Sequence, residues 1–326
     1  MKTQILRILR NASDHVSGQE LCEKLGVSRT AVWKTINKLK DEGYEIEAVQ
    51  NKGYRIVTYP DVVTESEIMS RLTTKWAGQQ VLYFDETDST NNQAKLAAEN
   101  GALHGTLAVA EQQSAGKGRR GRSWSSPRGT GIFMSLLLKP DLRPEYASML
   151  TLVAALSVSR ALEEVTELTP MIKWPNDLVV NKKKVTGILT EMSAELEQIY
   201  YVVIGIGINV NMEELPAEIK ETATSLCMEA GRKFSRSALI AAFLKNFEAD
   251  FEKFEKTSDL SILIEEYNQR LINRGNIVRV LDPAGEYTGK AIGINEMGGL
   301  LVEREDHSIQ VITSGEVSVR GVYGYV

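Results

Sequence analysis

Cysteine and histidine are scarce in this chain, and their scarcity excludes several kinds of chemistry. The 326 residues include two Cys, Cys22 and Cys227, and three His. The two Cys lie far apart and form no metal-binding motif, so we expect reduced thiols instead of a disulfide framework or a zinc site. His15, His104 and His307 lie outside the motifs described below, so the sequence offers no Ser-His-Asp set for nucleophilic catalysis.

Long apolar runs are also missing. No segment approaches the roughly 20 consecutive apolar residues that a membrane-spanning helix needs. The first ten residues, MKTQILRILR, lack the apolar stretch and the small-residue cleavage site of a secretion signal. We therefore expect a cytoplasmic protein without membrane contact. The length favours two or three globular domains.

An excess of positive charge is absent except near the N-terminus. The net charge is −5, which argues against a protein that coats nucleic acid with its whole surface. Residues 1–56 nevertheless hold ten Lys and Arg against seven Asp and Glu. A mildly basic head on an acidic body predicts that any DNA contact is confined to the head.

The first 40 residues show the pattern of three short helices. Apolar residues recur at helical spacing over 2–10. Residues 17–20, SGQE, have the spacing of a capping box, which predicts a second helix that ends at Gly26. Ser28 can cap a third helix that runs to about Lys40 and has a basic, polar outer face.

A strand pair follows these helices. YEIEAVQ and GYRIV alternate in polarity around Asn51-Lys52-Gly53, which predicts a β-hairpin. Two helices joined by a Gly-containing turn and followed by a hairpin are typical of a winged helix-turn-helix, so residues 1–60 are interpreted as a DNA-binding domain. For the third helix taken alone, the favoured interpretation would be that Arg29, Lys34 and Lys38 are merely solvated charges. The residues expected to meet bases or phosphates of operator DNA are Ser28, Arg29, Thr30, Lys34, Asn37, Lys38, Lys52 and Arg55.

Residues 65–271 alternate strand and helix patterns. Thr64-Glu65-Ser66-Glu67 predicts a second capping box at the start of this region. We expect a mixed, largely antiparallel sheet with helices packed on one side. The expected strands cover residues 81–84, 106–110, 131–138, 171–174, 178–180, 185–191 and 199–206. The expected helices cover residues 90–99, 145–168, 237–254 and 258–271.

Residues 272–326 contain short strand patterns separated by Asp-Pro, Gly-Gly and Ser-Gly turns, which indicate a small SH3-like β-barrel. Its expected strands cover residues 276–281, 287–294, 299–303, 308–313 and 316–320. The whole chain is therefore predicted to be of the α+β class, with a winged helix-turn-helix, a central mixed-sheet domain and a C-terminal barrel.

A glycine-rich and strongly basic segment lies in the middle of the chain. Gly116 to Gly121 match the pattern G-x-G-x-x-G. A dinucleotide-binding fold would need a helix directly after these glycines, whereas turn formers and a proline follow here. Residues 116–128 also hold five cations, Lys117 and four Arg. We interpret the segment as a loop that is mobile when empty and orders over an anion; the alternative is an exposed basic loop without a ligand.

Two further segments combine polar residues with strand ends. Lys173-Trp174-Pro175-Asn176-Asp177 places an amide and a carboxylate at an expected sheet edge. They could hold Mg²⁺ or a nucleotide there, or form only a turn. Lys184 enters the next strand. Gly205 and Gly207 alternate along a later strand, which indicates close approach by a ligand or another backbone.

The ordered set of motifs resembles that of biotin protein ligases. The motifs are DSTN (88–91), GKGRRGRSW (116–124), KWPND (173–177), KVTGIL (184–189) and GIGIN (205–209). Together with the winged helix they resemble the bifunctional class that also acts as biotin operon repressor, and the resemblance covers essentially the whole chain. It implies a class II synthetase-like ligase domain. The loop has Lys117 where Arg is also usual, so we expect less bidentate geometry there.

The resemblance implies a role for each matching residue. The implied biotin-binding set is Ser89, Thr90, Asn91, Gln113, Lys117, Gly118, Arg119, Lys184, Gly187, Gly205 and Gly207. The implied nucleotide-binding set is Arg119, Arg122, Trp124, Lys173, Asn176, Asp177 and Asn209, with Asp177 as the metal ligand. Lys184, Arg119 and Arg122 would act in catalysis by stabilising developing negative charge.

The resemblance also implies a reaction and partners. Biotin and ATP, with Mg²⁺, would give biotinyl-5′-AMP, and biotin would then pass to a lysine of the biotin carboxyl carrier protein. Biotinyl-5′-AMP would serve as corepressor by favouring a homodimer that binds operator DNA and represses biotin biosynthesis and transport genes. Two alternatives stay open: a lipoate ligase, and a transcription factor whose body only senses a ligand.

Overall fold

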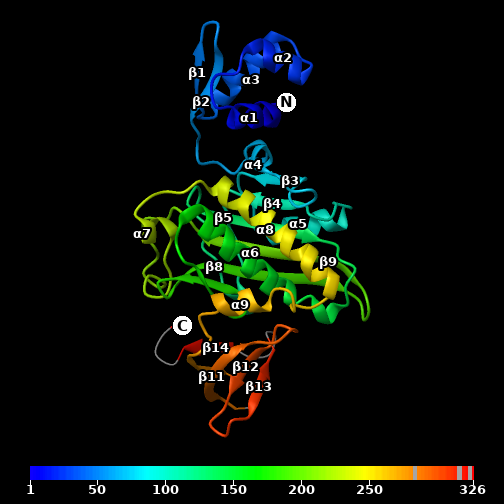
Figure 1. Ribbon diagram of the computed structural model, residues 1–326, viewed down its shortest axis with the longest axis vertical. Helices are drawn as coiled ribbons and strands as arrows, with labels where there is room; N and C mark the ends of the chain where they lie inside the picture. Colours follow the sequence, from blue (N-terminus) through cyan, green and yellow to red (C-terminus); the bar gives the residue numbers. More distant parts are fainter. Residues whose placement is uncertain (282–284, 314–317, 322–324) are drawn as a thin grey trace.

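A computed structural model describes the chain except for residues 282–284, 314–317 and 322–324. Figure 1 shows three parts along the long axis of the molecule: a small helical head, a large sheet with its helices, and a second sheet at the other end. Among the described helices, none is long and apolar enough to span a bilayer.

The head contains three helices and a hairpin, as predicted. Its elements are α1 (Lys2–Asn11), α2 (Gly18–Leu25), α3 (Arg29–Asp41), β1 (Glu45–Val49) and β2 (Gly53–Thr58). The Ser17 hydroxyl accepts a hydrogen bond from the Glu20 amide, and Ser28 does the same for Ala31, so both predicted N-caps are confirmed. Gly26 ends α2 in the left-handed conformation. These local signals determine where α2 ends and where α3 begins.

The middle part is built on a seven-stranded sheet in the order β3-β4-β5-β9-β8-β7-β6. Its strands are β3 (Val81–Phe84), β4 (Leu107–Ala110), β5 (Gly131–Leu138), β6 (Met171–Lys173), β7 (Asp177–Val180), β8 (Lys183–Ala194) and β9 (Ile199–Asn209). Strands β3 and β4 run parallel, and every other neighbouring pair is antiparallel. The predicted mixed, largely antiparallel sheet is therefore confirmed.

Helices cover both faces of this sheet, so the prediction of one covered side is wrong. On one face α5 (Thr90–Glu99) packs Ala94 and Ala98 against Leu137 and Val203. On the other face α6 (Met149–Thr166) and α8 (Arg236–Thr257) pack into the main core. The cause is visible in β5, where all eight residues are buried. A strand that is apolar on both sides must be covered on both sides.

A five-stranded antiparallel sheet forms the C-terminal part, in the order β13-β12-β11-β10-β14. Its strands are β10 (Ile277–Leu281), β11 (Tyr287–Ile294), β12 (Leu300–Glu303), β13 (Ile309–Ile312) and β14 (Ser318–Gly321). The predicted turns at Asp282-Pro283 and Ser314-Gly315, and the strand positions Glu316 and Val317, lie outside the described residues. The remaining helices are α4 (Glu65–Arg71), α7 (Leu226–Ala230) and α9 (Ile264–Arg270).

Glu67 ties the head to the body and does not close a capping box. Thr64 makes no side-chain cap at the start of α4, so that prediction is wrong. The fully buried Glu67 carboxylate instead accepts hydrogen bonds from Arg10 of α1 at 2.8 Å, Tyr44 at 2.7 Å and Ser237 of α8 at 3.0 Å. A buried carboxylate needs charged or strongly polar partners. Hydrogen bonds to these partners are therefore favoured over the capping hydrogen bond to the backbone at the start of α4.

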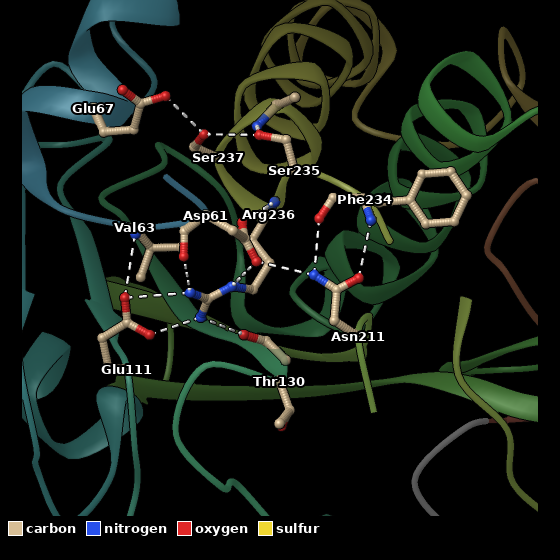
Figure 2. A network of polar contacts seen from close by, with 12 residues as sticks. Asp61, Val63, Glu67, Glu111, Thr130, Asn211, Phe234, Ser235, Arg236 and Ser237 are labelled. Atoms are coloured by element: carbon tan, nitrogen blue, oxygen red, sulfur yellow. Dashed lines mark hydrogen bonds and ion pairs between the residues drawn. The ribbon is translucent and has the colours of Figure 1, made fainter. Parts of the chain in front are cut away.

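Arg236, the first residue of α8, lies at the centre of a second buried network (Figure 2). Its guanidinium Nε contacts Asp61 of the linker at 2.9 Å, and Nη1 contacts Glu111 at 2.7 Å. Asp61 also accepts from Asn211, and Glu111 accepts from the Val63 amide. Burial lowers the pKa of Arg236, but its hydrogen bond to the Glu111 carboxylate and the charge of Asp61 raise this pKa overall. The linker, the end of β4 and the start of α8 therefore share one buried cation.

We predict that Arg236→Met destabilises the chain strongly. The substitution leaves Glu111 buried without its partner, and loss of one member of such a pair costs about 3–5 kcal/mol. Urea unfolding measures the loss. Lys233→Met is the matched control, because Lys233 and Glu213 pair at the surface with both side chains 70% exposed, and such pairs contribute about 0–1 kcal/mol. Equal costs for the two variants would refute the prediction.

We also predict a pH-dependent contribution from Glu67. Burial raises the pKa of this carboxyl, but Arg10, Tyr44 and Arg71 bring it below its ordinary value of 4.5. A carboxyl with a lower pKa in the folded state stabilises the fold above the unfolded-state value and loses this effect as the pH falls through the folded-state value. Glu67→Gln should therefore cost stability at neutral pH, and less as the pH drops below about 4.5. Urea midpoints of both proteins from neutral pH downwards test this; a cost that does not change with pH contradicts it.

Candidate active site and DNA-binding face

One cavity gathers all eleven residues of the predicted biotin-binding set. It lies on the α5 face of the central sheet, where the start of α5, strands β8 and β9 and the basic loop meet. The residues of that set in its wall are Ser89, Thr90, Asn91, Gln113, Lys117, Gly118, Arg119, Lys184, Gly187, Gly205 and Gly207. Met134, Ile188, Leu189 and Ile206, which the sequence did not single out, complete the wall together with Trp124 and Asn176.

The DSTN motif starts α5 at one end of the cavity. Asp88 accepts hydrogen bonds from Asn92 at 2.5 Å and from Gln93 at 3.0 Å, and these hydrogen bonds lower its pKa to about 2. The first turn of the helix is fixed in this way. Gln113 also holds this turn in place, because its Oε1 accepts a hydrogen bond from the Thr90 amide at 2.8 Å. The motif therefore presents Thr90 to the cavity from a rigid helix end.

The glycines of β8 and β9 leave room for the indole of Trp124. Gly187 and Gly207 are paired across the two strands. A Cβ atom at Gly207 would lie 2.5 Å from Trp124 Cε2, and one at Gly187 would lie 2.8 Å from Cζ3. Close approach at the alternate glycines is observed, but the approaching groups are the side chains of Asn91 and Trp124, and not the ligand or backbone that the sequence suggested. Trp124 Nε1 is buried and donates to no acceptor in the described part of the chain.

The basic loop is a tight turn and not the start of an α-helix, so the rejection of a dinucleotide-binding motif is confirmed. Arg119–Gly121 form a single 3₁₀ turn, and the Gly118 amide donates to the Arg122 carbonyl at 2.7 Å. Arg119 points to Asn176, with 3.0 Å between Nη1 and Oδ1. Burial lowers the pKa of Arg119, and the nearby carboxylate of Asp177 partly opposes this. The side chain of Arg122 is exposed and does not line the cavity.

Lys184 lies at the rim between the cavity and the KWPND segment. Its Nζ atom is 2.6 Å from Asp177 Oδ1 and 5.4 Å from the Trp124 ring centroid. Asp177 Oδ2 also accepts a hydrogen bond from Tyr325 of the C-terminal part. The resulting arrangement places one cation beside one carboxylate, at a cavity that Lys117 and Arg119 also line.

The predicted nucleotide-binding set is only partly brought together. Trp124, Asn176 and Arg119 line the cavity, and Asp177 lies behind Lys184. Lys173 instead stacks on the Tyr325 ring, with Nζ 3.3 Å from its centroid. Asn209 is buried at the end of β9 and donates to the Thr224 carbonyl. Lys173 and Asn209 therefore hold neighbouring segments in place.

Two polar residues beneath the cavity escaped the sequence prediction. Ser135 of β5 donates to Asn91 Oδ1 at 2.6 Å, and Glu191 of β8 accepts from Asn91 Nδ2 at 2.7 Å. Lys95 pairs with Glu191 at 2.5 Å. A signal for Ser135 did exist, because it is the single hydroxyl residue in the otherwise apolar strand GIFMSLLL.

The predicted DNA-contacting residues lie at the start of α3, along α3, and in the hairpin of β1 and β2. Seven of the eight are exposed and Asn37 is half-buried. A groove between α2, α3 and the hairpin is lined by Gln19, Arg29 and Asn51 among others. Trp33, which the sequence prediction missed, is 55% exposed and stands between Arg29 and Asn37 at four-residue spacing on α3. The outer face of α3 therefore carries cations, an amide and an indole, a set that suits contacts with DNA.

Comparison with known families agrees with this division into parts. Residues 2–55 match the model of an HTH domain, residues 83–209 that of the biotin/lipoate A/B protein ligase family, and residues 275–320 that of the biotin protein ligase C terminal domain.

Individual relatives match nearly the whole chain. It is 42% identical to the bifunctional ligase/repressor BirA of Bacillus subtilis over 94% of both chains, and 32% identical to BirA of Escherichia coli over 97% of this chain and 96% of that one. The solved biotin protein ligase from Aquifex aeolicus in complex with biotin and ATP is 37% identical, with a TM-score of 0.66 over 74% of this chain and 99% of that one. The chain therefore belongs to the biotin protein ligase family, in the class that joins the ligase to a DNA-binding repressor head.

Proposed function

We propose that this chain activates biotin with ATP to biotinyl-5′-AMP, and transfers biotin to a lysine of the biotin carboxyl carrier protein. The observation that carries the proposal is the cavity that unites all eleven residues of the predicted biotin-binding set, with three cations at its rim. The indole N–H of Trp124, which has no acceptor among the described residues, supports it, because a buried donor of this kind suits a site that receives a polar ligand.

The first step joins two anions, and the cations make this possible. A carboxylate oxygen of biotin attacks the α-phosphorus of ATP, the bond to pyrophosphate breaks, and its electron pair leaves with pyrophosphate. Lys184, Lys117 and Arg119 at the cavity stabilise the negative charge that develops on the phosphate oxygens. Lys184 is free to turn from Asp177 to the phosphate, because the two groups form only a single ion pair. Arg122, assigned to catalysis from the motif, would act only after the loop closes.

The second step needs no nucleophile from the enzyme. The lysine amine of the acceptor attacks the biotinyl carbonyl carbon, the bond to AMP oxygen breaks, and the amine loses a proton. The mixed anhydride must be kept from water until then, and we assign this role to the basic loop ordering over the ligand.

Mg²⁺ fits this site as an ion carried mainly by ATP. Among the described residues there is no group of three or more His, Cys, Asp or Glu that could form a cage. The Asp177 carboxylate and the Asn176 amide oxygen are hard donors of the kind that Mg²⁺ uses beside substrate phosphates. When bound, the ion would supply further positive charge to the phosphate oxygens.

We also propose that the ligase controls transcription in the cytoplasm, with biotinyl-5′-AMP as corepressor. The domain limits that suit this role are 1–60, 65–271 and 272–326. A homodimer would place two α3 helices on a palindromic operator. Exposed apolar side chains at the tip of β8 and β9, Met192, Leu196 and Tyr200, support such an association. A lipoate ligase or a silent ligand sensor would differ in the assay below, by transferring lipoate or by binding biotin without turnover.

We predict that Lys184→Ala lowers biotin-dependent ATP–pyrophosphate exchange by about 10²–10³-fold, the loss expected when one oxyanion donor is removed. The wild-type chain should transfer labelled biotin to carrier protein in the presence of ATP and Mg²⁺. Lys182→Ala is the matched control, because Lys182 lies exposed at the neighbouring hairpin tip. Near-normal exchange by Lys184→Ala would remove this residue from the mechanism.

We predict that Arg29→Ala and Lys34→Ala weaken binding to operator DNA by about 1–3 kcal/mol each when they contact bases, or reduce the salt slope by about one when they contact phosphates. Fluorescence anisotropy at several salt concentrations, with biotinyl-5′-AMP present, separates the two effects. Lys24→Ala is the control, because Lys24 pairs with Glu20 within α2. Unchanged affinity and salt dependence in both α3 variants would show that DNA binds elsewhere.

A further inference from the structure

A tyrosine that follows the last strand reaches the KWPND side of the candidate site. Figure 1 marks this end of the chain between the central part and the C-terminal sheet. The hydroxyl of Tyr325 donates a hydrogen bond to Asp177 Oδ2, and its ring lies over Lys173, with 3.3 Å between Nζ and the ring centroid. One side chain of the C-terminal part therefore contacts both ends of the KWPND segment.

The hydrogen bond from Tyr325 fixes the plane of the Asp177 carboxylate. Oδ2 is occupied by the tyrosine hydroxyl, and Oδ1 lies 2.6 Å from Lys184 Nζ. A free carboxylate turns easily about its last bond, and a donor held on one oxygen removes this freedom. Because Lys184 lines the cavity and Asp177 lies behind it, the hydroxyl keeps Oδ1 directed toward the cation of the site.

The ring of Tyr325 gives a buried ammonium group a partner. Lys173 is only 6% exposed, and burial of an ammonium group is unfavourable unless opposite charge or an aromatic face compensates for the lost water. Lys173 and Asp177 face each other in the antiparallel pair of β6 and β7. The hydroxyl and the ring of one tyrosine therefore hold the two strands of one hairpin.

The backbone leaves space for this arrangement at Gly321. This residue ends β14, where it pairs with Val278 of β10. A Cβ atom at Gly321 would lie 2.1 Å from the backbone oxygen of Val326. The residue next to Tyr325 therefore packs against a position that has no side chain, and this contact fixes where the tyrosine begins.

The C-terminal part also contacts the KWPND segment without Tyr325. Trp174 Nε1 donates to the Gly298 carbonyl at 3.0 Å, and the Trp174 amide donates to Asn273 Oδ1 at 2.9 Å. These contacts are buried and involve the backbone on one side. Loss of the tyrosine hydroxyl should therefore leave the two parts docked, and its effect should be confined to Asp177.

We propose that Tyr325 is a positioning residue for the nucleotide side of the active site: its hydroxyl holds the Asp177 carboxylate, and so sets how Asp177 and Lys184 meet the phosphates and metal ion of ATP. This inference rests on the proposed function. Without the hydroxyl, the negative charge of Asp177 is less dispersed, so Asp177 retains Lys184 more strongly and turns more freely. Nucleotide binding should then weaken, while biotin still meets an intact cavity wall at α5, β8 and β9.

The test measures binding of α,β-methylene-ATP with Mg²⁺ to the full chain saturated with biotin, by titration calorimetry. This nucleotide cannot release pyrophosphate, so the heat reports binding and not turnover. Tyr325→Phe keeps the ring over Lys173 and should weaken the nucleotide about three- to tenfold, the value of one hydrogen bond. The KM for ATP in pyrophosphate exchange should rise by a similar factor, and the affinity for biotin without nucleotide should stay unchanged.

Tyr287→Phe is the matched control. Tyr287 belongs to the same sheet and lies 4.0 Å from the Arg304 guanidinium, but its hydroxyl has no hydrogen-bond partner among the described residues. This variant should bind the nucleotide like the wild type. A second comparison uses the Asp177→Ala background, in which the Tyr325 hydroxyl has lost its partner, so Tyr325→Phe should cause no further loss there.

Equal nucleotide affinity of Tyr325→Phe and the wild type would overturn the inference. The same conclusion would follow from an undiminished loss in the Asp177→Ala background, or from a matching loss of biotin affinity, because either result means that the hydroxyl does not act through Asp177. A wild-type chain without biotin-dependent pyrophosphate exchange would instead overturn the proposed function, so the two failures are distinguishable.

Discussion

The buried guanidinium of Arg236 is the interaction on which the arrangement of the chain depends. It joins three segments that are distant in sequence: the linker at Asp61, the end of β4 at Glu111 and the start of α8. A buried cation is unfavourable unless its partners are fixed around it, so these segments can only occupy positions that complete the network. The seven-stranded sheet supplies the frame, and the ion network determines how the linker leaves it.

The same sheet also forms the ligand site, because glycines on two of its strands leave space above the sheet. Gly187 and Gly207 lie opposite each other on β8 and β9, and the indole of Trp124 fills the space. Cations then approach from the loop and from β8, where Lys184 is held by Asp177. An apolar floor with cations at its rim suits a substrate that is apolar along its length and anionic at its end, as biotin is.

The sequence was sufficient for features that depend on neighbouring residues. The caps at Ser17 and Ser28, and the glycine spacing at Gly205 and Gly207, follow from short-range chemistry and were predicted. The five ordered motifs contain ten of the eleven residues of the predicted biotin-binding set, all but Gln113, and all eleven line one cavity.

Features that depend on partners distant along the chain could not be predicted from the sequence. Glu67 has the spacing of a capping residue, but Arg10 and Ser237 arrive from other elements and take its carboxylate. The two-sided covering of the sheet required knowing that α5 and α6 lie on opposite faces. Lys173 and Arg122 belong to recognisable motifs, yet packing turns one toward Tyr325 and leaves the other in solvent. A motif identifies a position in the chain, while the direction of its side chain is set by what packs against it.

Only a few buried polar contacts connect the linker below the head to the wall of the cavity. Asp61 ends the linker, Arg236 joins it to Glu111, and Gln113 lies two residues further along. Gln113 accepts the Thr90 amide in the cavity wall. A shift of the linker that broke the Asp61 contact would leave a buried cation with one partner fewer, at a cost of several kcal/mol. Movement of the head and rearrangement of the cavity wall therefore both involve the same ion network. Any coupling between ligand binding and DNA binding through this route requires Arg236 to change partners.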